Sequence, residues 1–271
     1  MDPLSLGELE HENMLVAMSE AASTVPGSLV RRTNGVVLLA SGLEIRLFNQ
    51  VAVADDSATE GGIAAAVATL RERQDPFVVS LRRGVDDRFV GLMADLNLEL
   101  PADHGPLPGM ALVPIPDGNP PSIEGLEIRP VADAAGLDDH IVAAAAGFGM
   151  PEAMLRSIVA MDLWRKPGRT VYVGYVDGEP VTTGLGARTG RTIGVYNIST
   201  IESARKRGYG EAMTARVAAD GLAAGCDVAI LQASEMGRPI YERLGYRTVV
   251  EYDWYCEPEG PASSEASEPT A

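Results

Sequence analysis

The stretch RKRGYG at Arg205–Gly210 places three cationic side chains beside two glycines. Thr192–Ile201, just before it, favours a strand, and Glu211–Ala224, just after it, favours a helix that ends at Gly225. The stretch is therefore predicted to be a loop that leads from a strand into a helix. The first backbone N–H groups of a helix have no partner within it, the helix dipole is positive there, and glycine lets a ligand approach the backbone closely. Such a loop can hold a pyrophosphate.

The same loop has an alternative interpretation as a solvated basic turn that begins a helix. It is not a P-loop, because it contains no Gly-Lys-Ser/Thr, and it lacks the third glycine of the dinucleotide-binding fingerprint. Gly184 and Gly186 form another near match to that fingerprint, but they lie within a predicted hairpin strand and do not open a helix. The pyrophosphate interpretation therefore depends on the elements around the loop.

The second half of the chain is predicted to alternate strands and helices. Asp177–Gly178 is a two-residue hairpin signal between two β-rich runs. The expected strands are Leu126–Val131, Arg169–Val176, Glu179–Arg188, Thr192–Ile201, Asp227–Ala233 and Tyr246–Tyr255. The expected helices are Asp133–Met161, interrupted at Gly147–Pro151, then Glu211–Ala224 and Pro239–Leu244.

The loop and a second motif together resemble the GNAT N-acetyltransferase superfamily. Arg205-x-x-Gly208-x-Gly210 resembles its acyl-CoA pyrophosphate loop, and the run from Tyr241 to Gly245-Tyr246 resembles its Tyr-x-x-x-Gly-Phe/Tyr ending. The resemblance implies an α/β (α+β) fold with a mixed, mostly antiparallel, splayed sheet flanked by helices. It also implies transfer of an acetyl group from acetyl-CoA, wedged between the two central strands, to a primary amine by direct attack.

The resemblance carries a set of cofactor-binding residues onto this chain. Backbone groups of the strand before the loop would contact acetyl-CoA, and the loop would hold its pyrophosphate. For Ser234, just after a buried strand, a helix N-cap is the alternative role. The implied cofactor-binding residues are Ile198, Thr200, Ile201, Arg205, Lys206, Arg207, Gly208, Tyr209, Gly210 and Ser234.

Tyr241 matches the family's frequent general acid, which protonates the departing CoA thiolate. A phenol, with an ordinary pKa of about 10, is a reasonable proton donor to a thiolate, whose ordinary pKa is about 8.5. The alternative is a tyrosine that only packs on a short helix. Tyr241 is therefore the predicted catalytic residue.

The general base is not assigned by the sequence. The family often uses a Glu or a water chain on the strand before the loop, where this chain offers Tyr196 and Asn197. Neither is a good base. His140 lies on the first helix of the second half, and a lone helical histidine is more often a satisfied core or surface residue.

The first half of the chain has an α/β order of its own but no Arg-x-x-Gly-x-Gly loop. It is similar to the degenerate N-terminal half of tandem acetyltransferases, which implies that it walls the acceptor site or supports the fold. The expected helices are His11–Ala22, Ile63–Arg73 and Phe89–Leu96, and the expected strands are Gly35–Ala40, Leu43–Val53, Pro76–Leu81 and Met110–Val113.

The composition of the chain indicates how its domains are divided and which classes of partner are excluded. The Pro- and Gly-rich segment 114–121 predicts a linker between a degenerate domain at 1–120 and a catalytic domain at 121–256, and 257–271 is expected to be a disordered acidic tail. The net charge of −16 argues against a nucleic-acid partner. We expect no membrane span, a cytoplasmic location, no metal, one CoA per chain, and a homo-oligomer as a possibility.

Two functions remain open from the sequence. The first is an acetyl-CoA-dependent N-acetyltransferase. The second is a non-catalytic CoA-binding sensor or interaction protein that retains the fold. The intact loop and Tyr241 favour the first, and the missing base is the argument for the second.

Overall fold

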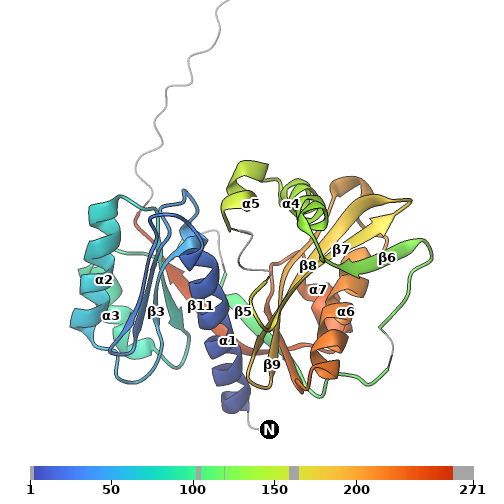
Figure 1. Ribbon diagram of the computed structural model, residues 1–271. Coiled ribbons are helices and arrows are strands. Elements are labelled where there is room, and N and C mark those ends of the chain that lie inside the picture. Colours follow the sequence, from blue (N-terminus) through green and yellow to red (C-terminus); the bar gives the residue numbers. More distant parts are fainter. Residues whose placement is uncertain (1–2, 102–104, 119, 159–164, 259–271) are drawn as a thin grey trace, which may run out of the picture.

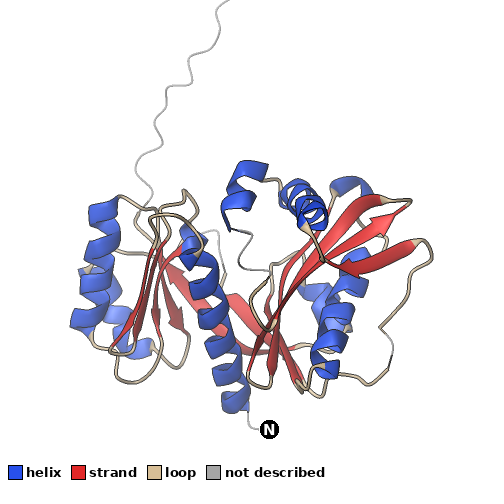
Figure 2. Cartoon of the chain, in the orientation of Figure 1, coloured by secondary structure: helices blue, strands red, loops and turns tan. Residues whose placement is uncertain are grey.

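The chain folds around one continuous sheet. The computed structural model describes residues 3–101, 105–118, 120–158 and 165–258, and in that part eleven strands follow the order β1-β2-β3-β4-β11-β5-β10-β9-β8-β7-β6 (Figures 1 and 2). The pairs β3–β4 and β9–β10 are parallel, and the other pairs of this sheet are antiparallel. The expected mixed, mostly antiparallel sheet flanked by helices is confirmed.

The N-terminal half, from α1 to β5, departs from expectation at three places. β1 was not expected, because Arg31 and Arg32 interrupt the apolar pattern of this exposed edge strand. The strand expected at Leu43–Val53 begins only at Asn49, because Arg46–Phe48 forms a 3₁₀ turn. The first helix begins earlier than expected. The elements are α1 (Pro3–Ser23), β1 (Leu29–Thr33), β2 (Val36–Ala40), β3 (Asn49–Val53), α2 (Glu60–Arg73), β4 (Val78–Arg82), α3 (Val90–Asp95) and β5 (Leu107–Leu112).

The C-terminal half, from β6 to β11, follows the expected order closely. Asp177 and Gly178 both have positive φ and turn the chain between β7 and β8, as the hairpin signal predicts. The long expected helix is interrupted at Gly149–Pro151, and its last three positions, 159–161, lie outside the described residues. The elements are β6 (Leu126–Pro130), α4 (Ala134–Phe148), α5 (Glu152–Ile158), β7 (Arg169–Val176), β8 (Glu179–Thr189), β9 (Thr192–Thr200), α6 (Tyr209–Ala223), β10 (Val228–Gln232), α7 (Arg238–Arg243) and β11 (Arg247–Tyr255).

The two halves repeat one order of elements and exchange their last strands. Three strands, a helix, a strand, a short helix and a strand occur in both, as β1 to β5 and as β7 to β11. β11 lies between β4 and β5, and β5 lies between β11 and β10. Tyr252 of β11 faces Arg82 of β4, just as Gly109 of β5 faces Gln232 of β10. The expected division at 120/121 falls in the connection from β5 to β6, and 259–271 of the expected tail lie outside the described residues.

β9 separates two packed layers. Ile193 and Val195 of β9 pack with Met213 and Val217 of α6 on one face. On the other face, Tyr196 reaches α1, which crosses the middle of the sheet in Figure 1. α4 also covers this second face, since Gly147 of α4 approaches the end of β9. Any group held between β9 and β10 would therefore have α6 on one side and α1 and α4 on the other.

Candidate functional site

The parallel strands β9 and β10 separate in the middle of the sheet. Their pairing ends at Gly194 and Ile230, whereas β9 continues to Thr200. A bulge follows in β9, where the register against β8 shifts and Asn197 adopts a positive φ of 54°. A bulge re-aims backbone and side-chain groups at such a point. Beyond the bulge, the edge of β9 that faces β10 is no longer paired with it.

Hydrogen bonds with two buried side chains, Thr183 and His140, hold the bulge in place. The Thr183 hydroxyl donates to the Asn197 carbonyl at 2.9 Å, and Asn197 Nδ2 lies 3.1 Å from His140 Nε2. His140 Nδ1 lies 2.9 Å from the Tyr172 carbonyl, which can only accept, so Nδ1 carries the hydrogen and Nε2 accepts from Asn197. Burial lowers the pKa of His140 to about 4. His140 is thus a satisfied core histidine that supports the bulge, as its lone helical position suggested.

The loop after β9 ends in an open helix start. α6 begins at Tyr209, so Tyr209 and Gly210 belong to its first turn and not to the loop as expected. Gly208 precedes the helix with φ of 82° and no side chain caps the N–H groups. Lys206 and Arg207 are exposed, and neither forms a salt bridge within the described part of the chain. These amides and cations suit an anion.

Arg205 has a structural task in this loop. Its guanidinium donates to the Gly147 carbonyl at 2.9 Å and to the Thr200 carbonyl at 3.3 Å. It thereby ties the end of α4 and the end of β9 to the loop. Lys206 and Arg207 remain as the outward cations. The one acidic side chain in the first turn of α6, Glu211, is paired with Arg243 at 2.9 Å.

The two loop glycines are required for different reasons. Gly208 has a left-handed backbone that disfavours other residues. A Cβ on Gly210 would meet its nearest neighbour, Thr200 Oγ1, at 3.5 Å, which is ordinary contact. The folded chain itself therefore does not require glycine at 210. Close approach of a ligand to the helix start would explain it.

The three strand residues differ in what their backbone offers. The Ile201 N–H donates to the Val181 carbonyl at 3.0 Å, and its carbonyl accepts from Ala204 at 3.0 Å. Because backbone groups alternate along an antiparallel strand, the Thr200 amide points away from β8, toward the edge that β10 has left. Ile198 directly follows the bulge residue Asn197, where this alternation is interrupted. The Thr200 amide is therefore the one that the strand pairing leaves for a bound carbonyl.

Tyr241 lies on α7 at the margin of the core beneath β10. It is half-buried and its ring stands edge-on to Tyr246, with centroids 6.1 Å apart. Burial raises its pKa. Its hydroxyl has no hydrogen-bond partner among the described residues, so it can donate to a group that enters the site. Ser234 Oγ accepts from the Gly237 N–H at 3.2 Å and so closes the turn before α7, whose N-cap position is Gly237 and not Ser234.

Residues of α1 also contribute to this site, which the sequence analysis did not predict. The Tyr196 hydroxyl donates to Asn13 Oδ1 at 2.7 Å, and Gln232 Nε2 donates to Glu10 Oε1. Glu10 and Asn13 are fully buried. No local signal could reveal this contact, because the partners lie more than 180 residues apart. Tyr196 is not a free base, because burial raises its pKa and its hydroxyl is engaged.

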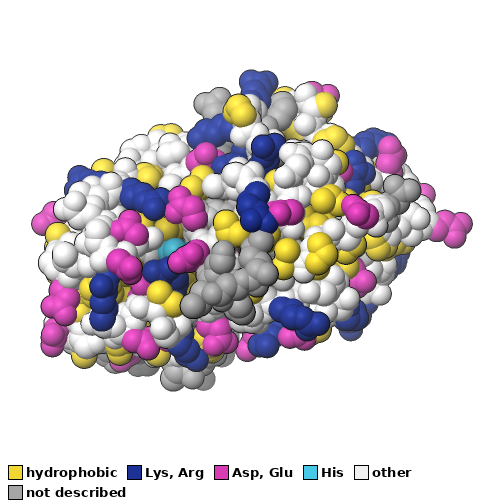
Figure 3. Space-filling model, turned by 90° about the horizontal axis from the view of Figure 1, so that it is seen from below, with side chains coloured by type: hydrophobic (Ala, Val, Ile, Leu, Met, Phe, Trp, Pro, Cys, Tyr) yellow, Lys and Arg dark blue, Asp and Glu magenta, His cyan; other side chains and the backbone are white. Residues whose placement is uncertain are grey.

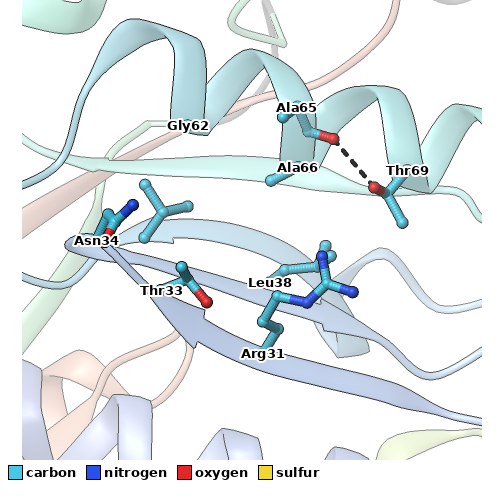
Figure 4. A pocket seen from close by; sticks show the side chains of 9 residues that line it. Arg31, Thr33, Asn34, Leu38, Gly62, Ala65, Ala66 and Thr69 are labelled. Carbon is cyan, nitrogen blue, oxygen red and sulfur yellow. Dashed lines mark hydrogen bonds between the residues drawn. The ribbon is translucent and has the colours of Figure 1, made fainter.

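A pocket lies elsewhere, in the N-terminal half. It occupies about 190 Å³ between α2 and the outer strands β1 and β2 (Figure 4). Arg31 is the charged residue of its lining, and the Thr69 hydroxyl is turned back onto the Ala65 carbonyl at 3.0 Å. It contains none of the residues predicted for the site and no acid–base pair.

The surface carries both signs of charge. On the face in Figure 3, Lys and Arg side chains are interspersed with Asp and Glu and do not gather into a basic patch. None of the described helices has the length and apolar character needed to cross a bilayer.

Comparison with known proteins identifies the fold. No family model and no curated protein sequence matches the chain. It is similar to the structure of a GCN5-related N-acetyltransferase from Kribbella flavida, with a TM-score of 0.68 and 17% identity over 91% of this chain and 96% of that one. A tandem GNAT protein from the clavulanic acid biosynthesis pathway matches with a TM-score of 0.59 and 13% identity over 93% and 95%. A GCN5-related N-acetyltransferase from Sphaerobacter thermophilus matches with a TM-score of 0.57 and 19% identity over 82% of this chain and 80% of that one. The chain thus has the GNAT fold in a tandem arrangement.

Proposed function

We propose that the protein is an N-acetyltransferase that transfers the acetyl group of acetyl-CoA to a primary amine, with its site in the C-terminal half. The observation that carries the proposal is the open start of α6. No side chain caps its amides, Lys206 and Arg207 form no salt bridge with any residue that the structure describes, and the fold does not need the glycine at 210. That start adjoins the bulged end of β9. The GNAT fold supports acyl transfer at this position.

In this proposal each group of the site has one role. The loop and the first turn of α6 bind the pyrophosphate of acetyl-CoA. The Thr200 amide donates to the thioester carbonyl, whose oxygen becomes negative as the amine attacks. The new C–N bond forms, the C–S bond breaks, and Tyr241 gives its proton to the departing thiolate. The attacking neutral amine gives one proton to solvent and keeps the other as the amide N–H, and Tyr241 regains a proton from solvent.

Release of the CoA thiol tests the proposal. The protein is incubated with acetyl-CoA and a panel of small amines, aminoglycosides and peptides, and free thiol is measured. Turnover with an amine, reduced in Gly210→Val at limiting acetyl-CoA, supports transfer at this site. Tight acetyl-CoA binding with no release across the panel would favour the CoA-binding sensor, and no binding at all would exclude both.

A further inference from the structure

A chain of buried hydrogen bonds crosses the junction of the two halves. It runs from the Val53 carbonyl on β3 through His11, Tyr252 and Glu10 to Gln232 at the end of β10. His11, Tyr252 and Glu10 are all buried, and Gln232 is half-buried beside the opening between β9 and β10. These hydrogen bonds therefore link the interior of the N-terminal half to the proposed site.

The hydrogens available to the hydrogen bonds among His11, Tyr252 and Glu10 can be counted. His11 Nε2 lies 2.7 Å from the Val53 carbonyl, which can only accept, so Nε2 carries a hydrogen. Tyr252 Oη lies 3.0 Å from His11 Nδ1 and 2.5 Å from Glu10 Oε2. The hydroxyl has one hydrogen for these two contacts. Both can be hydrogen bonds only if one more proton is present, on Glu10 or on His11.

We propose that Glu10, Tyr252 and His11 share one proton, and that its loss turns the Tyr252 hydrogen from His11 to Glu10 and places a negative charge beside Gln232. With the proton present, Glu10 donates to Tyr252, Tyr252 donates to His11, and the unit is neutral. Without it, Tyr252 donates to the Glu10 carboxylate and His11 Nδ1 has no donor. The proton goes to solvent, so the step balances.

The surroundings favour a proton on the carboxyl. Burial raises the pKa of Glu10 to about 7, even though its bonds to Tyr252 and Gln232 oppose the change. Burial and the charge of Arg82 lower the pKa of His11 to about 4. The unit therefore exchanges its proton near neutral pH, with Glu10 as the group that ionises.

The charged groups around the unit come from several elements. Arg82 on β4 is buried and bound to Asp86 through two bonds of 2.9 Å, so its charge is largely compensated. Glu12 on α1 is paired with Arg32 at the surface. On β9, the Tyr196 hydroxyl donates to Asn13. On β5, Gly109 packs directly against Glu10, because a Cβ added at this glycine would lie 2.6 Å from the Glu10 side chain. Glu10 is thus the group near Gln232 whose charge changes.

The inference deepens the proposed function and in this respect rests on it. Gln232 donates to Glu10 and is half-buried at the end of β10, where the pairing with β9 has ended. An ammonium group there is favoured when Glu10 is ionised, because opposite charges attract through a partly desolvated path. The site would therefore take a cationic amine more readily above neutral pH than below it.

Nuclear magnetic resonance tests the shared proton without any substrate. The full chain is labelled with ¹³C-glutamate and ¹⁵N-histidine and titrated from pH 5 to pH 9, and Glu10→Gln assigns the Glu10 signal. We expect the Glu10 carboxyl carbon and His11 Nδ1 to change with one midpoint near pH 7, while His11 remains neutral. Tyr252→Phe should separate the two responses. Glu12→Gln, on the same helix, should leave both unchanged.

Each outcome decides the inference. A Glu10 midpoint near its ordinary value of 4.5, or a His11 Nδ1 signal that ignores Glu10, would overturn it whatever the activity. If the shared titration is found and no amine is acetylated, the proposed function fails and the shared proton stands. If both hold, kcat/KM for the amine should rise several-fold through the Glu10 midpoint, and Glu10→Gln should remove that rise.

Discussion

The segment from β9 to α6 and the corresponding segment from β3 to α2 have the same architecture and opposite chemistry. The first has Lys206, Arg207 and an uncapped helix start. The second reads ADDSAT at 54–59, and Thr59 Oγ1 accepts from the Gly62 N–H at 3.1 Å. One helix start is thus closed by its own side chain in an acidic loop, and the other is open in a basic one. The state of the helix cap is thus what separates the segment proposed to bind acetyl-CoA from its counterpart in the same chain.

The largest expected effect tests whether the C-terminal segment performs catalysis. Tyr241→Phe removes one hydroxyl and keeps the ring in the core. If Tyr241 protonates the thiolate, kcat should fall by about 10²–10⁴-fold while acetyl-CoA affinity changes little. Steady-state kinetics with the best amine from the panel measures it. A kcat within about threefold of the original, with chemistry rate-limiting, would assign the proton to another group or to water.

The next effect tests the open helix start. Gly210→Val should weaken acetyl-CoA binding by about tenfold or more, because its side chain would occupy the space that a pyrophosphate needs. Gly208→Val should do the same and also lower stability, since φ at 208 is 82°. Calorimetric titration gives the affinities, and urea unfolding gives the stabilities. Unchanged affinity in both variants would contradict the cofactor loop.

A third effect concerns the support of the bulge, which β3 lacks. The pKa of His140 is lowered from 6.5 to about 4 in the folded state, so its contribution to stability is present above pH 6.5 and is lost as the pH falls toward 4. Between pH 7.5 and pH 5 the loss should be roughly 2 kcal/mol. Urea unfolding of the original protein and His140→Gln at both pH values measures it. Equal losses in the two proteins would mean that His140 is not buried in its neutral form.

A substitution in the N-terminal half should have the smallest effect, with no change in acetyl-CoA affinity. Gly61 of α2 occupies the position of Gly210 in α6, second in the helix, and a Cβ there meets nothing within 4 Å. Gly61→Val should leave acetyl-CoA affinity unchanged, and titration should give one acetyl-CoA per chain. Native mass spectrometry that finds two bound molecules would remove the contrast between the halves.

Local patterns predicted the elements well and their long-range partners poorly. The Asp177–Gly178 hairpin and the helix after the basic loop could be predicted because residue type and period determine them. β1 and the 3₁₀ turn at Arg46–Phe48 could not, because an edge strand with two arginines lacks the apolar alternation of a strand. The contact of Glu10 with Gln232 is set by how α1 crosses the sheet, and no spacing in the sequence encodes that.

The exchange of β5 and β11 has a consequence for how the chain is made. Arg83 next to β4 and Asp253 of β11 are 170 residues apart, so β4, which already pairs with β3, gains its second neighbour strand only after almost the whole described chain has been synthesised. Until then the emerging N-terminal half exposes an unpaired strand edge, which is the kind of surface that chaperones shield. Because β11 pairs with β4 and β5 pairs with β10, a chain cut between β5 and β6 should keep its two pieces joined through the sheet.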